Sequence, residues 1–170
     1  MKDATMAKEG QPIRMDSRAG KYLTFYLDHE EYGVEILKVQ EIIGRMPITP
    51  VPLTSQYIRG VINLRGKIHP IMDLKVKFGM DQTQITDETC IIVIRTTGIM
   101  MGVLVDRVSE VVSIDAGDIE DTPSFGADVN TEYLLGIGKA GGRVRLLLDI
   151  EKIITTADVI NLKKAAEPEP

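Results

Sequence analysis

The side chains that most often carry catalysis are scarce in this sequence, which has two histidines and one cysteine in 170 residues. His69 stands beside Pro70 with no serine or cysteine at motif spacing, and His29 lies in an expected turn between acidic residues. Cys90 opens an apolar run and is typical of a small core residue rather than a nucleophile. Two histidines and one thiol fill no zinc shell unless carboxylates do most of the ligation. We therefore expect no enzyme, no catalytic residue and no metal site.

Two glycine-rich segments have the letters of phosphate-binding loops. Gly136-Ile-Gly138-Lys-Ala-Gly141 fits the dinucleotide fingerprint, but that fingerprint needs a helix directly after the glycines, and residues 143–148 have the pattern of a strand. The segment from Gly60 to Lys67 has the wrong glycine spacing, and Ile68 replaces the hydroxyl that binds magnesium. We expect no cofactor and no small-molecule substrate. The rival hypothesis of a nucleotide-dependent enzyme predicts that the Gly136 loop binds a labelled nucleotide.

Composition excludes further classes of protein. Lys and Arg number 20 against 25 Asp and Glu, and this net charge of −5 disfavours nucleic acid as a partner. The longest apolar stretch, Ile99 to Val105, is far shorter than the roughly 20 residues of a membrane-spanning helix. Residues 1–20 carry scattered charges and no apolar segment of the kind found in secretory signals. We expect a cytoplasmic protein without direct membrane insertion.

The order of residues predicts a mostly β fold between two disordered tails, 1–20 and 158–170. Short runs of β-branched and aliphatic residues predict strands at 22–27, 60–64, 67–72, 90–95, 99–105, 133–137 and 143–148. Asp73 and Asp149 are predicted to cap two short helices, and Ile36 to Ile43 has a helical pattern that leaves Leu37 off the core-facing stripe. Such an exposed apolar residue suits a protein-binding patch.

The pattern of elements occurs twice. The segment 32–43 aligns without a gap on 101–112, and 55–74 aligns on 131–150, with Gly and Asp in step. Duplication explains these gapless blocks better than chance similarity does. The duplication predicts two small, closed or nearly closed sheets with an apolar seam between them, over approximately 21–80 and 88–157, with exchange of terminal segments left open. The second copy has a longer loop, within Ser113 to Asn130.

The copies differ most clearly at the first hairpin, where Arg65 precedes Gly66 and the second copy has Gly141 before Gly142. A long cation in a position that needs only turn chemistry is either a binding residue or an ordinary solvent-facing residue. Pro47, Pro50 and Pro52 favour a rigid crossover. The rival hypothesis of a proline-rich ligand protein predicts that a fragment of residues 44–54 binds a partner alone.

Four blocks in order, Glu31 to Ile42, Ile58 to Leu74, Gly102 to Val111 and Thr131 to Gly138, resemble the CheW family of bacterial chemotaxis coupling proteins. The resemblance covers Lys21 to Thr156 and implies a CheW-like domain of two pseudo-two-fold-related, five-stranded SH3-like β-barrels with short capped helices. It implies a non-catalytic adaptor that couples transmembrane chemoreceptors, the methyl-accepting chemotaxis proteins, to the histidine kinase CheA. The alternative is a CheW-like scaffold of a chemosensory pathway without a role in motility.

The resemblance also implies where the partners bind. The cytoplasmic receptor tip would dock near the seam between the barrels, on Val39, Glu41, Ile42, Asn63 and Arg65, with Cys90 and Gly102 bordering the site. Cys90 departs from the family pattern, in which an aliphatic residue is more common. Glu41 would orient Arg65 through a charge-assisted hydrogen bond. The regulatory domain of CheA would meet the exposed apolar ends of the barrels, where no residues are assigned, and the protein would be recruited to membrane-associated receptor arrays.

Overall fold

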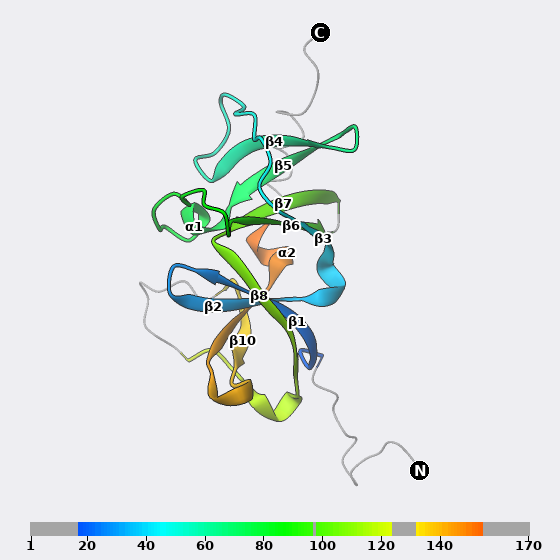
Figure 1. Cartoon of the computed structure of the whole chain (residues 1–170). Helices are drawn as coiled ribbons and strands as arrows, with labels where there is room; N and C mark the ends of the chain where they lie inside the picture. The colour runs from blue at the N-terminus through cyan, green and yellow to red at the C-terminus, as the bar shows by residue number, and fades with distance from the viewer. Residues whose placement is uncertain (1–16, 97, 124–131, 155–170) are drawn as a thin grey trace.

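The computed structural model describes residues 17–96, 98–123 and 132–154. The predicted tails lie outside this range apart from residues 17–20, and Gly20 already belongs to the first strand. The chain forms two antiparallel-rich sheets stacked end to end, with sheet A in the lower half of Figure 1 and sheet B in the upper half. The prediction of a mostly β protein is confirmed.

Sheet A has the strand order β8-β1-β2-β11-β10-β9 and sheet B the order β3-β6-β7-β5-β4. The strands of sheet A are β1 (Gly20–Leu27), β2 (Glu30–Glu35), β8 (Arg107–Ile114), β9 (Ile119–Glu120), β10 (Leu134–Gly138) and β11 (Arg145–Leu148). Those of sheet B are β3 (Val39–Ile43), β4 (Ile58–Leu64), β5 (Lys67–Asp73), β6 (Cys90–Thr96) and β7 (Ile99–Val105). The helical turns are η1 (Ile36–Lys38), α1 (Leu74–Lys77), η2 (Ala116–Asp118), η3 (Ala140–Gly142) and α2 (Ile150–Ile153).

The contiguous ranges 21–80 and 88–157 are not the two barrels. Strands β1 and β2 leave the first range to join β8–β11, because β2 pairs in parallel with β11 and β1 pairs with β8. The exchange of a terminal segment, left open by the sequence, is therefore the arrangement found. Sheet A also has a sixth strand, the two-residue β9, and its counterpart in sheet B is the isolated bridge between Thr49 and Val61.

The strand order supports the predicted duplication. Sheet B repeats the order of sheet A when each strand is replaced by its aligned partner, so that β8-β1-β2-β11-β10 corresponds to β3-β6-β7-β5-β4. The parallel pairs share their register, with Gly33 opposite Leu147 in sheet A and Gly102 opposite Ile71 in sheet B. The bulge between Ile58 and Gly60 likewise recurs between Leu134 and Gly136.

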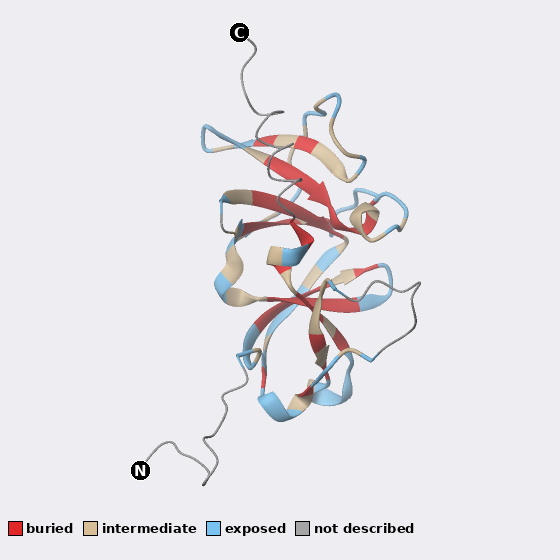
Figure 2. Ribbon diagram, turned by 180° about the vertical axis from the view of Figure 1, so that it is seen from behind, coloured by how far each residue is buried: buried red, intermediate tan, exposed pale blue. Residues whose placement is uncertain are grey.

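Three apolar clusters hold the fold together. The largest joins the sheets and includes Phe25 and Val34 of sheet A, Ile92 and Val103 of sheet B, and Ile153 of α2. This cluster is the predicted seam, and the buried residues in Figure 2 follow the strands on both sides of it. The other two lie inside the barrels that the sheets form, one in barrel B, made by sheet B (Ile62, Ile71, Ile91, Val93 and Leu104), and one in barrel A, made by sheet A (Tyr22, Ile114, Ile119 and Leu147).

The predicted helix over Ile36 to Ile43 is wrong. Only the turn η1 forms, and β3 follows it, because Val39 and Ile42 are β-branched residues that pair with Ile94 and Ile92 of β6. Leu37 is nevertheless 94% exposed, as expected, although the helical stripe on which that expectation was based does not form.

The two short helices α1 and α2 form, but only one is capped as predicted. Asp149 accepts hydrogen bonds from the backbone N–H groups of Glu151 and Lys152. The Asp73 carboxylate makes no such bond, and it instead accepts hydrogen bonds from Thr83 and Arg59. The two copies therefore use the aligned aspartates differently.

Candidate protein-binding site

The hairpin between β4 and β5 holds Arg65 in a defined position. Arg65 and Gly66 have φ angles of 54° and 85°, and positive φ at both central residues is the geometry of a type I′ turn. Asn63 supports the turn, because its Oδ1 accepts a hydrogen bond from the Gly66 N–H at 2.9 Å. The side chain of Arg65 is 70% exposed. The turn therefore presents a long cation to solvent at the tip of sheet B.

The guanidinium of Arg65 forms an ion pair with the carboxylate of Glu41 through Nη2 and Oε1. Glu41 belongs to β3, which lies at the opposite edge of sheet B from β4, so the pair connects the two edges across the barrel mouth. The side chain of Glu41 is 26% exposed. A pair this open to water contributes at most about 1 kcal/mol to folding, so stability alone does not account for it.

The other predicted residues of β3 lie on its opposite face. Glu41 lies across from Val93, which is part of the core of barrel B, whereas Val39 and Ile42 lie across from Ile94 and Ile92, which belong to the seam. Val39 is half-buried and Ile42 is 43% exposed. The structure thus brings Glu41 and Arg65 together, with Asn63 in the same turn as Arg65, and places Val39 and Ile42 on the other face of β3.

Two predicted border residues do not reach this surface. Cys90 opens β6 at the end remote from Ile94, and it packs half-buried against the seam. Gly102 is buried in the wall of barrel B, and a Cβ there would lie 2.4 Å from Cδ1 of Ile71 and 2.8 Å from Cγ2 of Ile91. Its position supports packing behind Glu41, because Val93 pairs with both residues.

Barrel A contains a counterpart of the ion pair that the sequence did not predict. Glu110 aligns with Glu41, and its Oε2 lies 3.5 Å from Nη2 of Arg145 on β11. Arg145 is 3% exposed, and its Nε donates to Glu31 at 3.0 Å. Burial favours the neutral form of Glu31, but the hydrogen bonds and charge of Arg145, with further support from Arg143, outweigh it and lower the pKa of this carboxyl.

The contrast between the barrels singles out one pair. In barrel A the guanidinium of Arg145 is enclosed, and it donates hydrogen bonds to Glu31 and to the carbonyl of Ala140. In barrel B, among the residues that the structure describes, Arg65 bonds only to Glu41, so most of its N–H donors face solvent. The guanidinium of Arg65 therefore has donors left for a carboxylate of another protein, whereas the guanidinium of Arg145 is enclosed.

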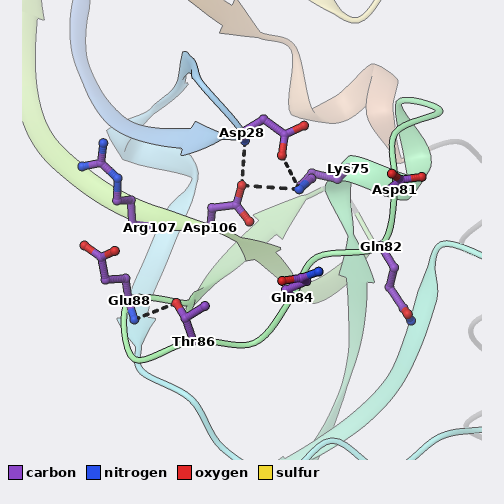
Figure 3. A pocket seen from close by; sticks show the side chains of 9 residues that line it. All are labelled: Asp28, Lys75, Asp81, Gln82, Gln84, Thr86, Glu88, Asp106 and Arg107. Carbon is purple, nitrogen blue, oxygen red and sulfur yellow. Dashed lines mark hydrogen bonds and ion pairs between the residues drawn. The ribbon is translucent and has the colours of Figure 1, made fainter.

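A polar pocket of about 410 Å³ lies where the two barrels meet, and neither Arg65 nor Glu41 lines it (Figure 3). Lys75 of α1 projects into its wall and bonds to Asp28 at 2.5 Å, with Asp106 at 3.6 Å. Burial lowers the pKa of Lys75, but the bond to Asp28 and the charge of Asp106 outweigh this and raise it. Because Asp28 follows β1 and Asp106 lies between β7 and β8, this cluster fastens the barrels together.

A family model described as a CheW-like domain matches residues 21–158. The chain belongs to the CheW family. It is 41% identical over 147 residues to the chemotaxis protein CheW of Klebsiella aerogenes, covering 86% of this chain and 89% of that one. It is 34% identical to CheW of Thermotoga maritima over 132 residues, covering 78% and 85%.

A solved CheW structure has the same fold. The crystal structure of the scaffolding protein TtCheW from Thermoanaerobacter tengcongensis aligns with a TM-score of 0.74 at 33% identity, covering 82% of this chain and 95% of that one. The resemblance read from the four sequence blocks to the CheW family is thus confirmed. Among the described residues no helix is long and apolar enough to cross a membrane, and no group of three or more His, Cys, Asp or Glu is placed to hold a metal ion.

Proposed function

We propose that this protein is a non-catalytic adaptor that couples the cytoplasmic tips of chemoreceptors to the regulatory domain of the kinase CheA. Membership of the CheW family supports this proposal, as does the similarity to a protein described as a scaffold. The adaptor works in the cytoplasm and is recruited to membrane-associated receptor arrays. It changes kinase output through differential affinity for the states of the kinase.

The observation that carries the proposal is the exposed pair of Arg65 and Glu41 at the mouth of barrel B. We infer that Arg65 anchors the receptor through a carboxylate of the receptor tip, since a guanidinium forms strong, directional hydrogen bonds with carboxylates. Glu41 holds the guanidinium in place before binding and lowers the entropy lost on association. Asn63 fixes the turn on which this geometry depends.

Apolar contact supplements this ionic anchor. Leu37 and Ile42 are exposed aliphatic residues that flank Glu41 in sequence, on η1 and β3. Hot spots of protein interfaces commonly combine a charged anchor with buried apolar neighbours. We infer that the receptor tip covers Ile42 and Leu37 while its carboxylate meets Arg65, which gives a modest interface that is strengthened by multivalency in an array.

Co-sedimentation with receptor-bearing membranes, with and without CheA, tests the proposal. Arg65→Glu and Glu41→Arg are each expected to lower the bound fraction at least tenfold, and the double charge swap is expected to recover part of it. Lys139→Glu is the matched control, because Lys139 pairs with Glu120 on the surface of barrel A at the aligned hairpin. Unchanged binding of folded Arg65→Glu protein would disprove the site. Absence of wild-type binding to both the receptor and CheA would disprove the function.

A further inference from the structure

The mouth of barrel B carries more positive charge than Glu41 balances. Lys67 opens β5 directly after the Arg65 turn, and Arg95 lies near the end of β6, opposite Met100 of β7. Strands β5 and β7 are parallel, so Lys67 and Met100 lie at the same end of sheet B. Lys67 and Arg95 are exposed, and within the described ranges neither forms an ion pair with a carboxylate. The excess is local, because the chain as a whole has a net charge of −5.

A β-bulge in β3 holds Arg95 next to the pair of Arg65 and Glu41. Gln40 is the extra residue of this bulge, and its Oε1 accepts a hydrogen bond from Nη2 of Arg95 at 2.5 Å. The following residue, Glu41, pairs with Arg65. Consecutive residues of β3 thus hold two guanidinium groups, one from β6 and one from the β4–β5 turn. Because an amide is neutral, Gln40 fixes Arg95 without cancelling its charge, and further N–H donors of Arg95 stay available.

Barrel A has an acid at the place where barrel B has Met100. Glu31 and Met100 are equivalent, since each pairs with the last-but-one residue of the preceding strand. Arg143 aligns with Lys67, and it donates to the Glu31 carboxylate at 2.5 Å. Barrel A therefore balances the cations of its mouth with a carboxylate of its own. In barrel B the corresponding side chain is apolar, and the cations lack that carboxylate.

We propose that a second carboxylate of the receptor tip binds over Met100, between Arg95 and Lys67, in the place that Glu31 takes in barrel A. Met100 packs against the barrel core, so this carboxylate lies on an apolar floor, where a lower dielectric strengthens its attraction to the cations. The inference rests on the proposed function and specifies it, because the receptor segment then carries two acidic groups, one for Arg65 and one for Arg95. Receptor tips without the second acid bind more weakly.

The affinity for receptor-bearing membranes, measured by co-sedimentation at two salt concentrations, tests the inference. Arg95→Gln should weaken binding about fivefold at about 50 mM NaCl and by less at about 500 mM, because salt screens exposed charges. Lys139→Gln is the matched control, since it removes one cation from the aligned hairpin of barrel A and should leave the affinity unchanged. Wild-type affinity of folded Arg95→Gln would overturn the inference and leave the proposed function standing. Absence of wild-type binding to the receptor would overturn both.

A variant that supplies the missing acid tests the position of the carboxylate. Met100→Glu gives barrel B the acid of barrel A, so it should occupy Arg95 and Lys67 and weaken receptor binding about tenfold. Met100→Gln has a similar shape without the charge and should weaken binding only about twofold. Adding Arg95→Gln to Met100→Glu should cost little more, since the cation is already occupied. Equal losses for Met100→Glu and Met100→Gln would overturn the inference. Arg95→Gln changes an exposed side chain, so the test stands even if Met100→Glu does not fold.

Discussion

Gly33 and Gly102 face equivalent neighbours in the two barrels, since Gly33 lies opposite Leu147 and Gly102 opposite Ile71 on parallel strands. The space available for a side chain differs between these two positions. A Cβ on Gly33 would lie 3.2 Å from Leu147, whereas one on Gly102 would lie 2.4 Å from Ile71. Neither glycine has a positive φ, so the difference is one of packing alone.

This difference predicts unequal costs for the same substitution. Gly102→Ala should destabilise the protein by about 1–3 kcal/mol, the usual cost of overpacking a core, and Gly33→Ala by less than about 1 kcal/mol. Urea unfolding of the two variants and the wild type measures both values. An equal or larger loss for Gly33→Ala would contradict the packing argument.

The sequence predicts the repeated elements well, because Gly and Asp at fixed offsets and β-branched runs are local signals. It fails at Ile36 to Ile43, where a helical spacing of apolar residues is also compatible with a strand and only pairing with β6 decides. It also gives no sign that β1 and β2 pair with β8 and β11, since such long-range pairing leaves no local pattern.

The candidate site, too, could be predicted from the sequence only in part. The Arg65-Gly66 turn and the pair with Glu41 follow from turn chemistry and the family resemblance. The enclosed pair of Glu31 and Arg145 does not, because the partners are far apart in sequence and Arg145 aligns with a histidine in the first copy. Burial of a charge becomes visible only once the sheets are assembled.

The enclosed pair predicts a pH dependence. The pKa of Glu31 is lowered in the folded protein, so the ionised carboxylate stabilises the fold above its ordinary pKa, and this contribution is lost as the pH falls through the folded value. Glu31→Gln should therefore be less stable than the wild type at pH 7, with a gap that narrows below about pH 4. Chemical denaturation at several pH values measures this gap. A constant gap would show that the charge of Glu31 does not stabilise the fold.

Removing the cation tests the same pair from the other side. Arg145→Met removes the buried partner of Glu31 Oε2 and leaves this carboxylate with Arg143 as its remaining guanidinium partner, so it should cost about 1–3 kcal/mol. Arg65→Met removes an exposed cation and should cost less than about 1 kcal/mol. Thermal unfolding of both variants compares them directly. Similar losses would mean that the two pairs are not divided into a structural one and an exchangeable one.

Lys75 predicts a loss of stability at the alkaline end. Its pKa is raised in the folded protein, so its bonds to Asp28 and Asp106 stabilise the fold fully below the ordinary lysine value and are lost as the pH rises through the folded value. Lys75→Met should reduce the free energy of unfolding by about 1–3 kcal/mol at pH 7, because acceptors lose their partner. The difference should shrink above about pH 10. Lys152→Met, at an exposed position of α2, is the control, and a Lys75→Met effect that persists at high pH would contradict the ionic explanation.

The aligned residues Asp73 and Asp149 should differ in how much stability their substitution by alanine costs. Asp149 caps α2, so Asp149→Ala should cost about 1 kcal/mol, the usual value for a lost N-cap. Asp73 is fully buried and bonds to Thr83 at 2.8 Å and to Arg59 at 2.8 Å, so Asp73→Ala should cost several times more because it leaves a half-buried guanidinium unpaired. The double variant Asp73→Ala with Arg59→Met should recover part of the loss, since it removes the unpaired charge as well. Urea unfolding of the three proteins measures this coupling. Additive losses would show that Arg59 and Asp73 do not act as a pair.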